Sequence, residues 1–239
     1  MTDNKFTLIV PMAADKPEYA DGMPYIFAPD RDGVPLCLKS IAGLPLDVFG
    51  QIYLTVLKKH VDRFGIDTLL DFYLHRLGIA NAKVTVLAEP TASQAETVAR
   101  TIEQEGVEGP IFIKDADGYF VLEDLWPHNA VALFPLERME LVDPRNKSFA
   151  SVDDMSYITN IIEKRVISNL FSAGGDCFES AADWLARYRH LCDATVPDAR
   201  IYMSHIIYSM LLEGRIFRPL AARDYKDWGT STLYRFYVS

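Results

Sequence analysis

The sequence predicts a mixed α/β domain whose central sheet is mostly parallel and is covered by helices on both faces. Strand-like and helix-like segments alternate through the first half of the chain. That order is typical of parallel sheets joined by helical crossovers. In addition, 49% of the 239 residues are hydrophobic, which is enough to bury such a sheet. With no repeat, low-complexity segment or linker in sight, we expect one domain over residues 1–239.

The expected elements follow from the hydrophobic patterns. Runs of β-branched and aromatic residues predict strands, and apolar residues that recur every three or four positions predict helices. The expected strands cover residues 6–10, 51–57, 83–87, 111–113, 129–134, 157–163 and 216–220. The expected helices cover residues 33–45, 58–77 (as one helix or two), 91–105, 180–189 and 202–213. The second half is less regular than the first, so we expect it to form a lobe that packs over the sheet.

Charge and cysteine content exclude several classes of protein. The net charge of -9 argues against a general nucleic-acid surface, which needs a basic face. Cys37, Cys177 and Cys192 show no paired spacing, which argues against a disulfide framework or a zinc site. No apolar run approaches the roughly 18 residues that a membrane-spanning helix needs. We therefore expect a cytoplasmic protein with no membrane span.

Two carboxylates follow the short apolar strand at 111–113. Asp115 and Asp117 are separated by one residue, and both come directly after the strand. In open α/β sheets, ligands bind at the carboxyl ends of the strands. Carboxylate oxygens suit Mg²⁺ or Mn²⁺. The pattern predicts a metal site, although Asp117 and Gly118 also fit an ordinary polar turn, and the residues alone leave both interpretations open.

Segments along nearly the whole chain resemble, in the expected order, motifs of sugar-phosphate nucleotidyltransferases of the GT-A-like type. They are residues 89–97, similar to the stretch before the metal strand; 111–120, similar to the metal strand; 160–164, similar to a Glu-Lys sugar-site segment; 172–178, similar to a Gly-rich turn; and 224–230, similar to a closing Asp-Xaa-Gly-Thr segment. The family includes proteins of bacterial capsule and surface-polysaccharide synthesis that resemble choline-phosphate cytidylyltransferases.

The resemblance implies a single GT-A-like (Rossmann-like) domain, with a nucleotide-binding half at 1–125 and an acceptor-binding half at 126–239. It also implies a reaction that needs Mg²⁺ (or Mn²⁺). A nucleoside triphosphate, CTP or UTP first, would be joined to a sugar phosphate or similar phosphate acceptor, with release of pyrophosphate. Members of the family often associate, so a homo-oligomer is consistent with it.

The resemblance also implies roles for particular residues. Asp117 and Asp227 would hold the metal, and Asp117 and Lys164 would be the catalytic residues. The nucleotide would be bound by Met12, Ala13, Ala14, Gln94 and Asp115. The acceptor would be bound by Glu163, Lys164, Gly174 and Gly175, with Lys164 holding its phosphate.

The first loop departs from the family pattern. That loop is usually Gly-rich and carries an Arg, but residues 11–19 read PMAADKPEY, with Glu18 near the expected Arg position. A Pro-Lys pair expected before the next helix is also missing. Three functions therefore stay open: an active nucleotidyltransferase with a rebuilt phosphate loop; a GT-A glycosyltransferase that uses Asp115-Ala116-Asp117 as its DxD motif; and a non-catalytic relative that binds a nucleotide or a partner.

Overall fold

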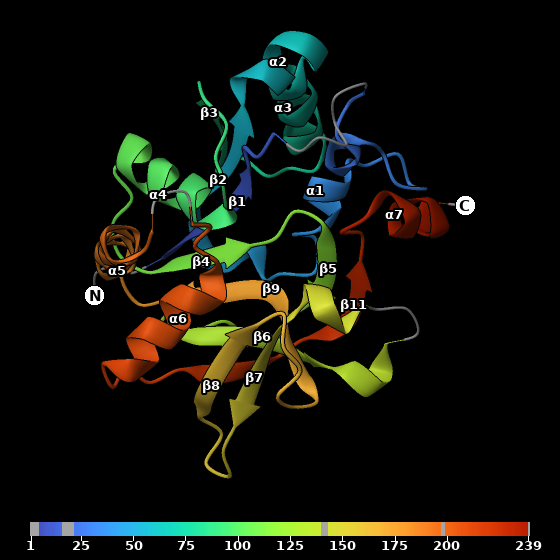
Figure 1. Cartoon of the computed structure of the whole chain (residues 1–239). Coiled ribbons are helices and arrows are strands. Elements are labelled where there is room, and N and C mark those ends of the chain that lie inside the picture. Colours follow the sequence, from blue (N-terminus) through green and yellow to red (C-terminus); the bar gives the residue numbers. More distant parts are fainter. Residues whose placement is uncertain (1–4, 16–21, 140–142, 197–198, 239) are drawn as a thin grey trace.

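Parallel pairing around one hydrophobic strand forms the centre of the molecule (Figure 1). The computed structural model describes residues 5–15, 22–139, 143–196 and 199–238. In it, β1 (Phe6–Met12) lies between β2 (Phe49–Leu57) and β4 (Ile111–Lys114) and is parallel to both. β3 (Ala82–Leu87) extends the parallel part beyond β2. These strands are the four that the alternating pattern of the first half predicts.

The second half of the chain completes the same sheet with antiparallel pairs. β9 (Leu170–Phe178) runs antiparallel between β4 and β6 (Ala130–Pro135), and β10 (Arg218–Ala221) is parallel to β6. A hairpin of β7 (Ser148–Val152) and β8 (Ile158–Glu163) joins at β9. Over the described residues the sheet has nine strands. The observed architecture is a single α/β domain with a mixed, mostly parallel sheet, as the sequence predicts.

A separate two-stranded ribbon lies beside the main sheet. β5 (Gly118–Val121) pairs antiparallel with β11 (Arg223–Asp227), and Asp227 lies opposite Gly118. The pairing joins the segment after β4 to the C-terminal part of the chain. It therefore places Asp117 and Asp227, which are far apart in sequence, at the same end of one ribbon.

Helices cover both faces of the sheet because side chains alternate along β1. Ile9 belongs to one buried cluster and Val10 to the other. The Ile9 face is covered by α4 (Gln94–Glu105), α5 (Ala181–Ala194) and α6 (Met203–Leu212), which lie together in Figure 1. The Val10 face is covered by α1 (Leu36–Lys39), α3 (Ile66–Arg76) and α7 (Ser231–Val238), with α2 (Lys58–Phe64) leading into α3. Single 3-10 turns occur at Tyr25–Phe27, Leu46–Val48, Leu136–Arg138 and Pro144–Asn146.

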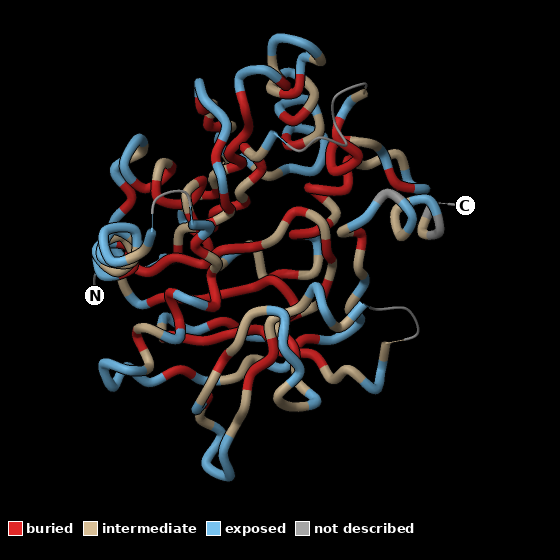
Figure 2. The backbone as a smooth tube through the Cα atoms, in the orientation of Figure 1, coloured by how far each residue is buried: buried red, intermediate tan, exposed pale blue. Residues whose placement is uncertain are grey.

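Burial follows this layering (Figure 2). The central strands are buried, whereas the outer faces of the helices and the tip of the β7–β8 hairpin are exposed. None of the helices in the described residues is long and apolar enough to cross a membrane.

Two expectations about local structure are wrong. The helix expected at 33–45 is only the four-residue α1. Beyond it the chain turns, and the Gly43 carbonyl accepts a hydrogen bond from Leu122 at 3.0 Å, so a contact with the end of β5 replaces further helix. The Gly-rich turn expected at 172–178 is instead part of the long central strand β9. The segment at 58–77, expected as one helix or two, forms two helices that meet at Gly65, which has a left-handed φ of 64°.

Candidate functional site

Two cavities open at the carboxyl ends of β1 and β4. The β1–α4 cavity, of about 620 Å³, lies between the end of β1, the start of α4 and the segment after β4. The β9–β11 cavity, of about 420 Å³, is lined from β7, β8, β9 and β11. Gln94, Asp115, Asp117 and Tyr202 line both cavities, so the two spaces meet at the aspartates. A ligand that filled both would pass directly over Asp115 and Asp117.

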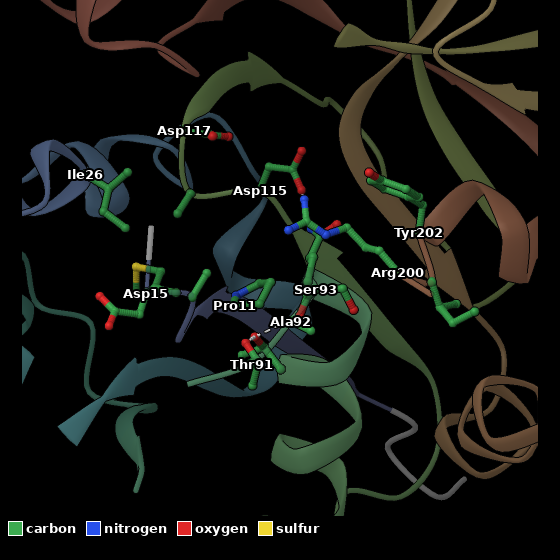
Figure 3. A pocket seen from close by; sticks show the side chains of 16 residues that line it. Pro11, Asp15, Ile26, Thr91, Ala92, Ser93, Asp115, Asp117, Arg200 and Tyr202 are labelled. Carbon is green, nitrogen blue, oxygen red and sulfur yellow. Dashed lines mark hydrogen bonds between the residues drawn. The ribbon is translucent and has the colours of Figure 1, made fainter. Parts of the chain in front are cut away.

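The start of α4 forms the floor of the β1–α4 cavity (Figure 3). Ser93 is the N-cap, and its hydroxyl accepts a hydrogen bond from the Glu96 N–H at 3.1 Å. The Glu96 carboxylate in turn accepts one from the Ala92 N–H at 2.7 Å. This reciprocal cap fixes the loop before the helix. Because a helix N-terminus carries partial positive charge, the floor favours an anionic ligand.

A buried lysine holds the turn that carries the two aspartates. Lys114 is fully buried, and its Nζ donates to the carbonyl oxygens of Asp115 and Gly118, each at 2.7 Å. Its ammonium also lies 4.6 Å from the centre of the Phe120 ring. Burial lowers the pKa of Lys114 to about 8, against the opposing effect of Asp115 and Asp117. The Lys114 ammonium therefore fixes the turn through two of the turn's backbone carbonyl oxygens.

Asp115 is held from two further sides. Gln94 Nε2 donates to Asp115 Oδ1, and the Asp115 N–H donates to the Gly174 carbonyl at 2.8 Å. Burial, followed by the charge of Asp117, raises the pKa of Asp115. Gly174 has a φ of 82°, and a Cβ there would collide with the Asp115 carboxylate. The glycine in β9 is thus required by the aspartate that packs over it.

Asp117 and Asp227 converge across the β5–β11 ribbon. The Trp228 N–H donates to the Asp117 carbonyl at 2.8 Å, and the Gly229 N–H donates to Asp227 Oδ1 at 2.8 Å. A Cβ placed on Gly229 would lie 3.0 Å from Asp227 Oδ1 and 3.7 Å from Asp117 Oδ2. Oxygens of both carboxylates therefore border the same small space beside Gly229.

Lys147 reaches this space from the start of β7. Its Nζ lies 2.6 Å from Asp227 Oδ2 and donates to the Tyr225 hydroxyl at 2.7 Å. The exposed fraction is 15% for the Lys147 side chain and 9% for that of Asp227. Burial acts to lower the pKa of Lys147, but the interactions with Tyr225 and Asp227 outweigh it and raise the pKa. Lys147 is therefore a buried cation paired with a predicted metal ligand.

Carboxyl groups line the far side of the β9–β11 cavity. Glu163 Oε2 accepts hydrogen bonds from the hydroxyls of Ser148 and Ser204, the latter at 2.7 Å. Asp176 is 5% exposed, and no described residue hydrogen-bonds its Oδ1. Burial, and then the charge of Asp115, raise the pKa of Asp176 well above its usual range. Glu163 and Asp176 thus present carboxyl oxygens that can accept hydrogen bonds from a ligand.

Most of the site residues predicted from the sequence line these cavities. Met12 and Ala14 line the β1–α4 cavity; Glu163, Gly174 and Asp227 line the β9–β11 cavity; and Gln94, Asp115 and Asp117 line both.

Three predicted site residues lie outside the lining of the two cavities. Ala13 is buried at 1% exposure in a small apolar cluster. Gly175 faces the core, where a Cβ would collide with the Phe120 ring. Lys164 is exposed, and its Nζ donates to the Tyr202 hydroxyl at 3.1 Å, so it approaches the site only through Tyr202.

The structure also adds site residues that the sequence analysis missed, namely Lys147, Asp176, Arg200 and Tyr202. Figure 3 shows the Arg200 side chain extending from the segment before α6 across the β1–α4 cavity towards Asp115. Arg200 is the one cation among the described residues that line this cavity. Lys147, Arg200 and Tyr202 stand in no pattern that marks a site, and Asp176 lies in the 172–178 segment, where only Gly174 and Gly175 were predicted to bind. All four reach the cleft through the packing of segments that are distant in sequence.

The donor set fits a divalent cation that also binds a phosphorylated ligand. Within the described ranges, no group of three or more His, Cys, Asp or Glu side chains is arranged to hold a metal. Two carboxylates facing one space are nevertheless the usual protein contribution to Mg²⁺, which keeps waters and takes phosphate oxygens from its substrate. The other oxygen of Asp227 is paired with Lys147.

Comparisons with solved structures show which proteins share this fold. The chain superimposes on the nucleoside-diphosphate-sugar pyrophosphorylase from Vibrio cholerae RC9 with a TM-score of 0.78 at 18% identity, covering 97% of this chain and 99% of that one. For the inositol-1-phosphate CTP transferase from T. maritima the TM-score is 0.67 at 18% identity, covering 97% and 94%. For a UDP-glucose pyrophosphorylase complexed with UDP-glucose it is 0.70 at 13% identity, covering 96% of both chains.

The chain shares its fold with these three proteins. At these identities the likeness shows the fold and not the reaction. No protein-family model matches the chain, and a search of curated proteins finds no match. The activity therefore has to be argued from the cleft itself.

Proposed function

We propose that this protein is a Mg²⁺-dependent nucleotidyltransferase that joins a nucleoside triphosphate to a phosphorylated small molecule and releases pyrophosphate. The observation that carries the proposal is the meeting of two cavities at Asp115 and Asp117, beside the convergent Asp117 and Asp227 carboxylates. A transfer between two phosphorylated substrates needs two adjoining binding spaces with the site of charge neutralisation between them.

The nucleotide is assigned to the β1–α4 cavity. Its helix N-terminus and Arg200 supply positive charge for the phosphates. Described residues 11–15 contain neither the glycines nor the Arg of the usual phosphate loop, so Arg200 takes over charge neutralisation from the opposite wall. CTP or UTP is the proposed nucleotide, since similar folds include a CTP transferase and a UDP-glucose pyrophosphorylase.

The acceptor is assigned to the β9–β11 cavity. Glu163 accepts hydrogen bonds from hydroxyl groups of the acceptor, as it does from the Ser204 hydroxyl. Gly174, which has no side chain, allows the acceptor to approach the backbone of β9. This arrangement follows the proposed division of the domain at residues 125 and 126, although Arg200 and Tyr202 reach across it. The proposal includes a cytoplasmic role in capsule or surface-polysaccharide synthesis, which the sequence resemblance implies.

In the proposed reaction, a phosphate oxygen of the acceptor forms a bond to the α-phosphorus of the triphosphate. The bond from the α-phosphorus to the oxygen that bridges it to the β-phosphorus breaks, and its electron pair leaves with pyrophosphate. A divalent cation at Asp117 and Asp227 would neutralise charge on the α-phosphate. The residues of the chain align the two substrates and exclude water, which is the main work in phosphoryl transfer.

The proposal is tested first by thermal melting with CTP, UTP, GTP, ATP or dTTP, each with and without Mg²⁺. At about 100 times its Kd, the preferred triphosphate should raise Tm by about 5 °C or more, in a Mg²⁺-dependent way. Asp117→Asn should abolish that shift and reduce pyrophosphate release at least about 100-fold, because it removes a direct metal ligand. Asp124→Asn, at an exposed aspartate of the same region, is the matched control.

Other outcomes select the two remaining functions. Stabilisation by a nucleotide-sugar alone, with glycosyl transfer but no pyrophosphate release, would favour the glycosyltransferase in which Asp115-Ala116-Asp117 is the DxD motif. Stabilisation without turnover across a panel of phosphorylated acceptors would favour a non-catalytic binding protein. Either result would contradict the nucleotidyltransferase proposal.

A further inference from the structure

The Lys147 ammonium pairs with Asp227, beside the predicted metal position. Its Nζ is 2.6 Å from Asp227 Oδ2, whereas Asp227 Oδ1 faces the space shared with Asp117. Both oxygens of Asp227 are thus in use: one faces the predicted metal position and the other holds an internal cation. The same carboxylate serves two positive groups.

The backbone of Lys147 is fixed, but its side chain has space to rotate into the β9–β11 cavity. The Lys147 carbonyl accepts a hydrogen bond from the Lys164 N–H at 3.0 Å where the β7–β8 hairpin begins. The ammonium lies 5.3 Å from the centre of the Tyr225 ring and 5.9 Å from that of Phe171, so aromatic walls flank it. The remaining side opens into the β9–β11 cavity, which Lys147 lines. A rotation of the side chain therefore moves the ammonium into the cavity.

A divalent cation at Asp117 and Asp227 changes the balance of charge around Lys147. A cation held by these two carboxylates would compete with the ammonium for Asp227, and the two positive charges would repel each other. A buried ammonium that loses its carboxylate is strongly destabilised unless another anion replaces it. Among the described residues that line this cavity, Lys147 is the one cation, and the other charged groups are carboxylates. The phosphate group of a bound acceptor is an anion that can replace Asp227 as the partner of the Lys147 ammonium.

We propose that Lys147 is an exchangeable internal counter-ion. It neutralises Asp227 when the metal position is empty, and the metal displaces it towards the phosphate of the acceptor. This inference rests on the proposed function and deepens it, because it names Lys147, and not the exposed Lys164, as the residue that holds the acceptor phosphate. It makes metal and phosphate binding mutually reinforcing, and such coupling is reciprocal between the two ligands.

The test is a Mn²⁺ titration followed by electron paramagnetic resonance, without nucleotide and with or without inorganic phosphate as the probe. In the wild-type protein, phosphate should tighten Mn²⁺ binding about 5-fold or more, within the usual range of such couplings. Lys147→Gln retains a donor for Tyr225 but removes the charge. It should bind Mn²⁺ about 3- to 10-fold more tightly than the wild type without phosphate, because the competing cation is gone. Its coupling to phosphate should be lost.

Matched variants separate this role from a structural one. Lys147→Arg keeps the positive charge. It should retain both the competition with Mn²⁺ and the coupling between Mn²⁺ and phosphate binding. Lys226→Met removes an exposed lysine next to Asp227 and should leave both quantities unchanged. Lys164→Met should likewise leave the phosphate coupling intact. Thermal melting confirms that each variant is folded before the titration.

Two results would overturn the inference, and they differ. If the wild type and Lys147→Gln bind Mn²⁺ equally and show the same coupling to phosphate, Lys147 is a static structural ion pair, and the proposed function stands. If neither binds Mn²⁺, with or without phosphate, the inference fails. The proposed function is then decided separately, by whether a triphosphate with Mg²⁺ stabilises the wild type and not Asp117→Asn.

Discussion

The two cavities are built in different ways. The β1–α4 cavity is lined largely by short stretches that are continuous in sequence, such as residues 91–94 before and at the start of α4. Its described lining includes small and apolar residues, and Arg200 is its one cation. The β9–β11 cavity takes charged side chains from separate segments: Lys147 comes from just before β7, and Glu163, Asp176 and Asp227 come from β8, β9 and β11.

This difference suggests a division of labour within the cleft. A cavity lined by backbone and a helix N-terminus binds phosphates through groups that every residue carries. A cavity lined by fixed, buried charges instead discriminates between ligands by how well they complement those charges. We therefore expect substitutions in the β1–α4 cavity to change nucleotide affinity, and those in the β9–β11 cavity to change acceptor choice and metal coupling.

The sharpest test of this comparison is Arg200→Ala. If Arg200 neutralises the outer phosphates of the nucleotide, the variant should bind the triphosphate about 10- to 100-fold more weakly, the cost of one charged hydrogen bond. Binding of the matching nucleoside monophosphate should change less than about 2-fold. Isothermal titration calorimetry with both ligands measures the two effects. Equal weakening of both would show that Arg200 acts on the base or sugar, or on the fold.

Arg165→Ala is the control for Arg200. Arg165 is also exposed, but it is not among the described residues lining either cavity. Arg165→Ala removes the same charge as Arg200→Ala. Because distant surface charges are screened, it should leave the affinities for the triphosphate and the monophosphate within about 2-fold of the wild type.

A smaller effect is expected from Gly174→Ala, compared with Gly214→Ala. Both glycines have a positive φ, 82° and 80°, so both substitutions strain the backbone. A Cβ at Gly214 meets nothing within 4 Å, whereas one at Gly174 collides with the Asp115 carboxylate. Gly174→Ala should therefore lower the free energy of unfolding by about 1–3 kcal/mol more than Gly214→Ala. Denaturant unfolding measures this difference, and equal losses would show that Asp115 moves away freely.

The smallest effect should come from a histidine outside both cavities. His60, in α2, is 2% exposed and packs 6.0 Å from the Phe27 ring centre. Burial lowers the pKa of His60, with Lys59 adding to the effect and Asp15 opposing it. The unfolded chain therefore binds the proton more tightly than the folded chain. The stability contributed by neutral His60 is present above its unfolded pKa and is lost as the pH falls below about 6.5.

Replacement of His60 should remove this part of the pH dependence. His60→Gln should show a smaller fall in the free energy of unfolding between about pH 7 and 5 than the wild type. His75→Gln, at an exposed histidine of α3, should retain the wild-type slope. An unchanged slope in His60→Gln would mean that other groups account for the acid sensitivity. Neither variant should alter ligand affinity.

Local patterns determined much of the fold in advance. The alternation of β-branched runs with amphipathic segments predicted β1 to β4 and the helices between them, because a crossover carries its own hydrophobic period. β6, β8 and β10 were also expected, from the apolar runs at 129–134, 157–163 and 216–220. The strands that the sequence analysis missed are β5, β7, β9 and β11. β9 contains Gly174 and Gly175, which indicate a turn locally but are required in a strand because Asp115 and Phe120 pack against them. β5 and β11 are strands only because they pair with each other.

The sequence by itself determined where Asp115 and Asp117 lie in the fold. Asp115 and Asp117 follow a buried strand, and that local fact places them at the ligand-binding edge of the sheet. Only the tertiary structure decided which lysine enters the cleft. Lys164 follows Glu163 in a family-like motif yet lies exposed against Tyr202, whereas Lys147 is buried against Asp227. A buried ion pair depends on partners brought together by strand pairing, over a separation of 80 positions in the chain that no local pattern encodes.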